Sequence, residues 1–278
     1  MAETEEHELT FLEHLEELRW HVVRAAVSIV VFAVIAFLAK DFIFGEILLA
    51  PSRLDFWTYR MLCELGEKMG SPILCIEALP FEIQNRTMFG QFSTHLMASF
   101  VVGIVCAFPY AFWEVWRFIS PGLYEEERKA SGGAVFFVSV LFLAGVLFGY
   151  YIVSPLAINF LSNYQVDASI VNQIDLTNYI STICRLVLAC AIMFQLPVVV
   201  YFLSKAGIVT PEFLRAYRKH AFIVMLALSA ILTPPDVMSQ VLVAMPLVVL
   251  YEAGIHISAF VHRKNKQELA VTHHDDEY

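Results

Sequence analysis

Two clusters of carboxylates carry the most specific chemistry in this chain. The first precedes the earliest apolar segment and comprises Glu13, Glu16 and Glu17, which lie off the apolar face of an expected amphipathic helix. The second is a run of three glutamates ending at Glu127, followed directly by basic residues. A carboxylate can bind a guanidinium bidentately, so two separated carboxylates would suit two arginines. The plain alternative for each cluster is a hydrated loop face that binds nothing.

Two further polar residues lie inside otherwise apolar segments. Gln195 precedes Pro197 in one segment, and Glu252 interrupts another. Polar groups there either mark a functional face or form hydrogen bonds between helices, worth about 0.6 to 2 kcal/mol each. Pro197 is expected to kink its helix.

The sequence offers no candidate for catalysis. It contains no His-Glu-x-x-His zinc motif, no Gly-x-Ser-x-Gly elbow and no phosphate loop. The histidines fall mostly at segment edges or in tails, where they are usually solvated, so neither a metal site nor a cofactor is expected. A net charge of −9 also argues against nucleic acid as a partner.

The five cysteines divide into two groups. Cys106, Cys184 and Cys190 lie in apolar runs and are expected to act as small hydrophobic residues. Cys63 and Cys75 share one loop, where they could form a disulfide if that loop faces an oxidising compartment. The sequence leaves that pairing open.

The composition indicates a membrane protein. Of 278 residues, 58% are hydrophobic and only 16% are charged, with a mean hydropathy of +0.64. Soluble domains carry roughly 25% charged residues, and this chain has too few to cover a soluble globule of its size. The acidic start has no signal-peptide pattern, so the first apolar run is expected to stay as an anchor.

Six apolar segments are expected to form helices that cross or enter the bilayer. A crossing helix needs about 20 apolar residues. The segments are 22–39, 96–116, 134–160, 180–203, 221–232 and 241–260. The fifth would reach only about 18 Å at 1.5 Å per residue, too short to span an undistorted bilayer, and the sixth is interrupted by Pro246 and Glu252.

The distribution of basic residues predicts the orientation. If the N-terminus is cytoplasmic, most Lys and Arg residues fall on the cytoplasmic side, and the opposite side has basic residues only in the loop 40–91. Both termini are therefore expected in the cytoplasm. The chain is interpreted as one membrane domain, 1–278, with a cytoplasmic lead-in at 1–21, a long outer loop at 40–91 that can hold short helices, and a disordered cytoplasmic tail at 262–278.

Three motifs, in order along the chain, resemble those of the TatC family, the multispanning core subunit of the twin-arginine protein translocase. They are residues 14–19, residues 115–124 followed by Glu127 and Arg128, and residues 232–237 with Ser239 and Gln240. Pro51 after the first segment, Pro197 in the fourth and Glu252 in the sixth support the match. The resemblance covers about residues 11 to 260.

The resemblance implies an all-α membrane protein with six transmembrane helices in a cupped, glove-like arrangement, of which the last two are too short for the bilayer. It also implies a function: recognition of the Arg-Arg signal peptide of folded proteins, and their export across the bacterial cytoplasmic (inner) membrane by means of the protonmotive force. The implied partners are single-span TatA-type subunits, TatB-type subunits where these exist, and further copies of the chain.

The resemblance assigns roles to individual residues. Those implied for signal-peptide binding are Glu17, Glu127, Arg19, Phe118, Tyr124 and Arg128. Those implied for partner docking, at polar or intramembrane positions, are Gln195, Glu252, Asp236, Gln240 and Pro51. Gln195 stands where such proteins often have a glutamate, which favours hydrogen bonding over titration, and Trp20-His21 replaces residues that are often basic.

Two other classes of protein make different predictions. A secondary transporter with broken helices would show internal inverted symmetry, which the sequence lacks. An intramembrane enzyme would need a nucleophile with a base, or a metal cluster, and neither is evident. A transporter would move solute alone in liposomes, whereas a translocase subunit would depend on its partners.

Overall fold

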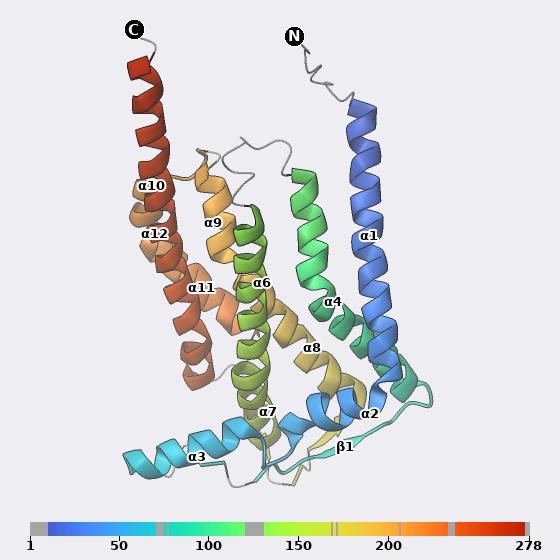
Figure 1. The fold of residues 1–278 in the computed structure, drawn as a ribbon. Coiled ribbons are helices and arrows are strands. Elements are labelled where there is room, and N and C mark those ends of the chain that lie inside the picture. Colours follow the sequence, from blue (N-terminus) through green and yellow to red (C-terminus); the bar gives the residue numbers. More distant parts are fainter. Residues whose placement is uncertain are drawn as a thin grey trace. The chain divides into compact units, whose positions relative to one another are not determined.

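The structure is a computed structural model, and it describes residues 11–275 except 71–74, 77, 120–130, 168, 171, 206 and 233–236. The chain divides into two compact units, each of which is described by itself. The first comprises Met1–Lys40 and His95–Val140, and the second comprises Asp41–Thr94 and Leu141–Tyr278. Helices dominate both units (Figure 1).

The first unit consists of two long helices and the first residues of α6 (Ser131–Phe148). The long helices are α1 (Phe11–Leu38) and α4 (Gly90–Ile119), whose first residues belong to the second unit. A Cβ on Gly103 of α4 would lie 2.7 Å from the backbone nitrogen of Ala33 in α1, so the glycine permits close approach of the two backbones. Further along, the rings of Phe37 and His95 stack with centroids 4.0 Å apart. Ala33 contacts Gly103, and the later Phe37 contacts the earlier His95, so the two helices are antiparallel.

The second unit begins with the segment expected as an outer loop, and that segment contains short helices as predicted. They are α2 (Lys40–Phe42), the π-helix η1 (Ile43–Leu48), the 3-10 helix η2 (Ala50–Ser52) and α3 (Trp57–Met69). Gly70, with a φ of 66°, ends α3 in the left-handed conformation that glycine adopts without strain. The structure joins Cys63 of α3 to Cys75 by a disulfide.

The second unit also contains a small parallel sheet, which was not predicted from the sequence. Strand β1 (Glu82–Gln84) pairs with β2 (Gln173–Asp175), with Ile83 opposite Ile174. The side chain of Asp175 accepts hydrogen bonds from the backbone N–H of Arg86, at 3.3 Å, and of Thr177, at 2.9 Å. The second bond caps the N-terminus of α8 (Leu176–Met193).

The third and fourth apolar segments are each interrupted. The third comprises α6 (Ser131–Phe148), the π-helix η5 (Gly149–Val153) and α7 (Ser154–Asn163). The fourth breaks between α8 and α9 (Leu196–Lys205), where Pro197 lacks a backbone donor. A Cβ on Gly145 would lie 2.7 Å from Cα of Ala191, and one on Gly149 would lie 2.9 Å from Cα of Val187, so these glycines bring the two segments together.

The last segments are α10 (Pro211–Ala216), α11 (Arg218–Leu232) and α12 (Val237–Asp275). α11 has 15 residues, in agreement with the predicted short fifth segment. The prediction that the sixth is also short is wrong: α12 has 39 residues, because Pro246 lies inside the helix without ending it. α12 continues as a helix to Asp275, where the sequence analysis expects a disordered tail.

Five helical segments in the described parts of the chain are long and apolar enough to cross a membrane. They are Glu16–Leu38, Gly90–Ile119, Val135–Asn163, Leu176–Lys205 and Gln240–Arg263. The chain is therefore a mostly helical membrane protein with five long apolar helices. α11, the other predicted segment, is shorter than these five.

Candidate functional site

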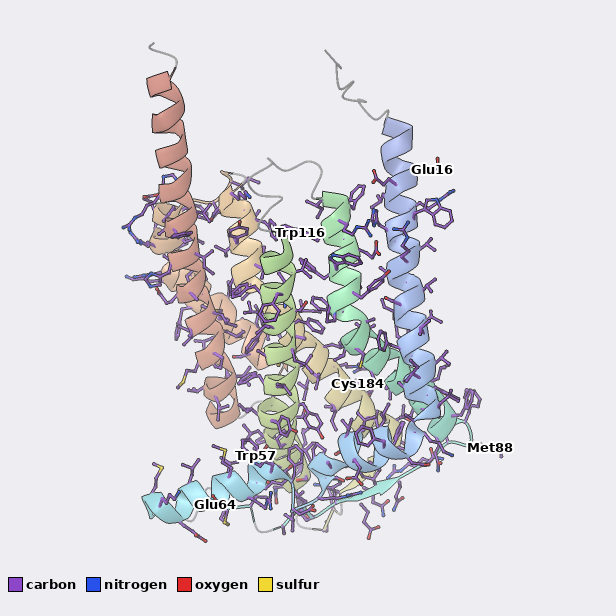
Figure 2. All side chains as sticks on the ribbon, viewed as in Figure 1. Glu16, Trp57, Glu64, Met88, Trp116 and Cys184 are labelled. Carbon is purple, nitrogen blue, oxygen red and sulfur yellow. A yellow bond between two sulfur atoms is a disulfide. The ribbon has the colours of Figure 1, made fainter. Side chains whose placement is uncertain are left out.

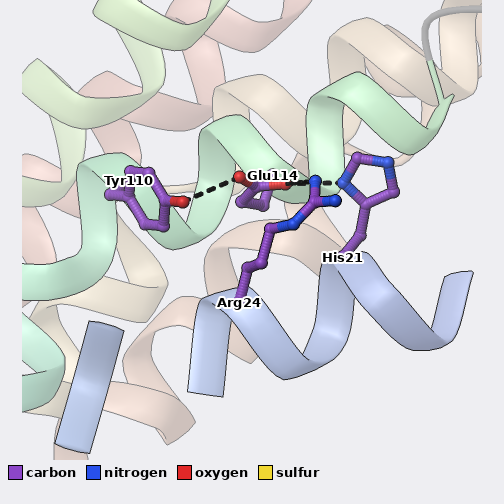
Figure 3. Close-up of polar contacts among 4 residues, drawn as sticks. All are labelled: His21, Arg24, Tyr110 and Glu114. Atoms are coloured by element: carbon purple, nitrogen blue, oxygen red, sulfur yellow. Dashed lines mark hydrogen bonds and ion pairs between the residues drawn. The ribbon is translucent and has the colours of Figure 1, made fainter. Parts of the chain in front are cut away.

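A buried carboxylate lies between the two helices of the first unit. Glu114 of α4 is 1% exposed, and its Oε2 lies 2.6 Å from Nδ1 of His21 on α1 (Figure 3). Its other oxygen, Oε1, accepts a hydrogen bond of 2.9 Å from the hydroxyl of Tyr110, one turn earlier on α4. A guanidinium nitrogen of Arg24 lies 3.6 Å from Oε2. We refer to His21, Arg24, Tyr110 and Glu114 as the Glu114 cluster.

The Glu114 cluster offsets the cost of placing a carboxylate within an apolar segment. Both helices are long and apolar enough to cross a membrane, and an ionisable group in such a segment costs roughly 2.5–3.5 kcal/mol or more unless it is paired. Here both carboxylate oxygens accept hydrogen bonds, and two basic side chains from α1 approach Oε2. The contacts join the N-terminal part of α1 to the C-terminal part of α4.

The residues implied for signal-peptide binding lie close to this cluster where the structure describes them. Glu17 is exposed one helical turn before His21, and no ion pair involves it among the described residues. Phe118 lies one turn after Glu114, and its ring centroid is 6.3 Å from that of His21. Arg19 is exposed, and its guanidinium lies 3.3 Å from the carboxylate of Glu16, near the start of α1 (Figure 2).

Four of the implied residues lie outside the part of the chain that the structure describes. Three of them, Tyr124, Glu127 and Arg128, belong to the segment 120–130, and the fourth, Asp236, belongs to 233–236. α4 ends at Ile119, so the segment with Glu127 follows directly on the helix that carries Glu114.

The described residues implied for partner docking come from α12, from the break between α8 and α9, and from η2. Glu252 of α12 forms an ion pair of 2.8 Å with Arg218 of α11, with both side chains about half exposed. The Gln240 side chain donates a hydrogen bond of 3.3 Å to the carbonyl of Leu226. Gln195 is half-buried at the break between α8 and α9, and Pro51 is buried, with its carbonyl accepting a hydrogen bond of 2.9 Å from Tyr59.

The described residues contain no group of three or more His, Cys, Asp or Glu side chains that could hold a metal ion. Outside the apolar segments, burial alone would raise the pKa of Asp175, but backbone donors from Arg86, Thr177 and Asn178 outweigh it and hold the pKa below its ordinary value. This carboxylate has a structural role as the cap of α8.

Sequence reasoning did not identify Glu114. The available signal was an acidic residue inside an expected apolar segment, Leu96 to Trp116, because an intramembrane ionisable residue is by default a candidate functional residue. His21 was noted only as a replacement for a basic residue, and Arg24 only as one of many basic residues. Their pairing with a residue more than ninety positions away in the sequence requires the fold.

Comparison with known proteins gives one consistent result. Residues 13–246 match the family model described as TatC, Sec-independent protein translocase protein. The chain is 39% identical over 262 residues to the Sec-independent protein translocase protein TatC of Blattabacterium sp. subsp. Periplaneta americana, covering 94% of this chain and 98% of that protein. It is 31% identical over 270 residues to TatCy of Bacillus subtilis, covering 97% and 96%.

The fold is also similar to that of solved structures. One is a crystal structure of the twin-arginine translocase receptor TatC in DDM, with a TM-score of 0.68 and 32% sequence identity over 88% of this chain and 99% of the other. A second crystal structure of the same receptor gives a TM-score of 0.65 and 30% identity, over 90% and 100%.

Proposed function

From the premise that the chain belongs to the TatC family and is the core receptor subunit of a twin-arginine translocase, we propose that Glu17 and Glu127 bind the two signal-peptide arginines. The protein is a translocase component and not an enzyme. Glu17 is exposed on α1, where a guanidinium of a bound peptide can reach it, and no ion pair involves it among the described residues. Arg19, Phe118, Tyr124 and Arg128 would shape the same site.

The observation that supports this assignment is the Glu114 cluster. It holds α1 near Glu17 against α4, from whose end the segment with Glu127 departs. Because this buried pairing already holds the two helices together, a bound peptide would not have to order them itself. Such preorganisation increases affinity by reducing the entropy lost on binding.

The basic residues support the proposed orientation, and membership of the family supports the proposed localisation. With both termini in the cytoplasm, Glu17 and Glu127 share the cytoplasmic face, as a receptor for proteins awaiting export requires. We place the chain in the bacterial cytoplasmic membrane, with α11 as a short sixth membrane segment in a cupped arrangement of helices.

Single-span TatA-type and TatB-type subunits are the proposed partners, with export powered by the protonmotive force. Gln195, Glu252, Asp236, Gln240 and Pro51 are the positions proposed for docking them. Gln195 is half-buried at the break between α8 and α9, and Glu252 is half exposed within the apolar segment Gln240–Arg263. Polar side chains at such positions suit helix–helix contact within a bilayer.

Peptide binding tests the proposal. A fluorescent signal peptide with an Arg-Arg pair is titrated onto the purified protein in nanodiscs, with a Lys-Lys peptide for comparison. Loss of a charge-assisted hydrogen bond costs about 1.5–3 kcal/mol, so Glu17→Gln and Glu127→Gln should each weaken Arg-Arg binding by roughly 10- to 150-fold.

Glu212→Gln is the control, because Glu212 is an exposed carboxylate of α10 that has no part in the proposed site. It should leave binding nearly unchanged. Equal affinity for the Arg-Arg and Lys-Lys peptides, or an equal loss in the Glu212 variant, would contradict the proposal.

A further inference from the structure

Helix α3 carries a stripe of exposed apolar side chains. Trp57, Met61, Leu65 and Met69 recur every four residues and are between 39% and 72% exposed. Side chains at this spacing lie on one side of a helix. Arg60 and Glu67 fall on another side, and Glu64 lies at the edge of the stripe. Lys68 projects between Trp57 and Met61, where its long side chain can extend to water. The exposed surface of α3 therefore has an apolar side and a charged side.

The first turn of α3 is fixed to the third apolar segment. The hydroxyl of Tyr59 donates to the carbonyls of Pro51 and Pro155, at 2.9 and 3.2 Å, and the hydroxyl of Thr58 donates to the carbonyl of Tyr151. The rings of Trp57 and Tyr151 meet edge to face with centroids 5.7 Å apart. The position of α3 in the second unit is therefore set by hydrogen bonds and ring contacts.

The apolar stripe begins at a hollow on a membrane-spanning segment. Trp57 lines a groove of about 710 Å³ together with Ala144, Leu147, Phe148, Tyr151 and Phe194. Leu147 and Phe148 belong to the apolar segment Val135–Asn163, and Leu147 is 47% exposed. An exposed apolar surface on a membrane-spanning segment suits contact with lipid, and Trp57 belongs to this surface.

The direction of α3 indicates that the rest of its apolar stripe can contact lipid as well. α3 runs across the direction of α7 and α12, which belong to the same unit (Figure 1). Its 13 residues make it about 20 Å long, too short to cross a hydrocarbon core of roughly 30 Å. An amphipathic helix that crosses the direction of the spans at their end has the geometry of one lying in the membrane interface.

We propose that α3 is an interfacial helix whose stripe, Trp57, Met61, Leu65 and Met69, is embedded in the lipid of the membrane side reached after the first crossing. This interaction surface is additional to the signal-peptide site and independent of it. Arg60 and Lys68 are balanced within α3 by Glu64 and Glu67, so the contact depends on apolar area and not on anionic lipid.

Spin labels on the two sides of α3 test the proposal. Single cysteines replace Met61 or Leu65 on the stripe, and Arg60 or Glu67 on the charged side, in a Cys106→Ser background that retains the Cys63–Cys75 disulfide. Mass spectrometry checks that the disulfide is intact. In nanodiscs, power saturation compares collisions with oxygen, which concentrates in lipid, and with a water-soluble nickel chelate.

The labels at positions 61 and 65 should show an oxygen-to-nickel accessibility ratio several-fold higher than those at 60 and 67. The difference should persist when phosphatidylglycerol is replaced by phosphatidylcholine. Equal ratios on the two sides would place α3 in water and overturn the proposal. Protection of the stripe labels from both reagents would also overturn it, because protein and not lipid would then cover the stripe.

Discussion

The carboxylate of Glu114 is costly within an apolar segment, and its basic neighbours His21 and Arg24 reduce that cost to different extents. His21 lies at 2.6 Å from the carboxylate and is buried, whereas Arg24 lies at 3.6 Å and is half exposed. His21 should therefore contribute more to the pairing of α1 with α4. The contacts of the Glu114 cluster should therefore stabilise the first unit and also position the proposed receptor site.

Removal of His21 should destabilise the protein more than removal of Arg24. His21→Ala leaves a buried acceptor without its nearest donor, which costs about 1–3 kcal/mol, while Arg24→Ala removes a longer and partly solvated contact. Thermal unfolding in detergent measures both. In a double-mutant cycle, His21→Ala combined with Glu114→Ala should cost less than the sum of the single changes. Additive costs would show that the two side chains do not interact.

The sequence predicted individual residues only where local chemistry was sufficient. Glu17 and Glu127 stood out because acidic clusters near apolar segments are visible in the linear sequence. Glu114 did not, because its role depends on a partner in another helix, and its own neighbours in the sequence are apolar or aromatic. The structure supplied that partner.

Close glycine contacts hold the third and fourth apolar segments together in the second unit. Gly145→Ala would place a Cβ 2.7 Å from Cα of Ala191, a backbone atom that cannot move aside without shifting α8. Overpacking of this kind costs about 1–3 kcal/mol, so the unfolding midpoint should fall. Gly133→Ala, on the same helix with nothing within 4 Å of the added Cβ, should be neutral or slightly stabilising. Equal effects would contradict the packing role of Gly145.

Asp175 should make the capped start of α8 sensitive to acid. Its folded pKa lies below the ordinary value for aspartate, about 3.9, so its contribution is complete above that value and is lost as the pH falls through the folded pKa. In thermal unfolding from pH 6 to pH 3, wild type should lose more stability than Asp175→Asn. Parallel curves for the two proteins would show that Asp175 contributes no such pH dependence.

At the level of elements, the sequence predicted the apolar helices and the interruption at Pro197, but not the other interruptions. The short fifth segment was predicted from its length, because hydropathy alone determines how far an apolar run extends. The β1–β2 pair and the π-helices η1 and η5 were not predicted, since three-residue strands and single wide turns depend on tertiary contacts. The resemblance implied a short last helix, and this was wrong, because α12 continues through Pro246.

The orientation of the whole chain can be tested by cysteine labelling. Asp167 lies in the connection between the third and fourth apolar segments, and Lys219 lies at the start of α11; both are exposed. If both termini are cytoplasmic, a membrane-impermeant maleimide should label Asp167→Cys in intact spheroplasts and Lys219→Cys only in inverted vesicles, each in a Cys106→Ser background. The reverse pattern would place the receptor site on the wrong face of the membrane.

Energetic coupling between Glu17 and a signal-peptide arginine tests the central claim most directly. Peptides with Arg-Arg, and with either arginine replaced by glutamine, are titrated onto wild type and Glu17→Gln in nanodiscs, and the four affinities of each cycle give a coupling energy. The account predicts a coupling of about 1.5–3 kcal/mol for one of the two arginines and a clearly smaller value for the other, whose partner is Glu127. Zero coupling for both arginines would show that Glu17 does not bind the signal.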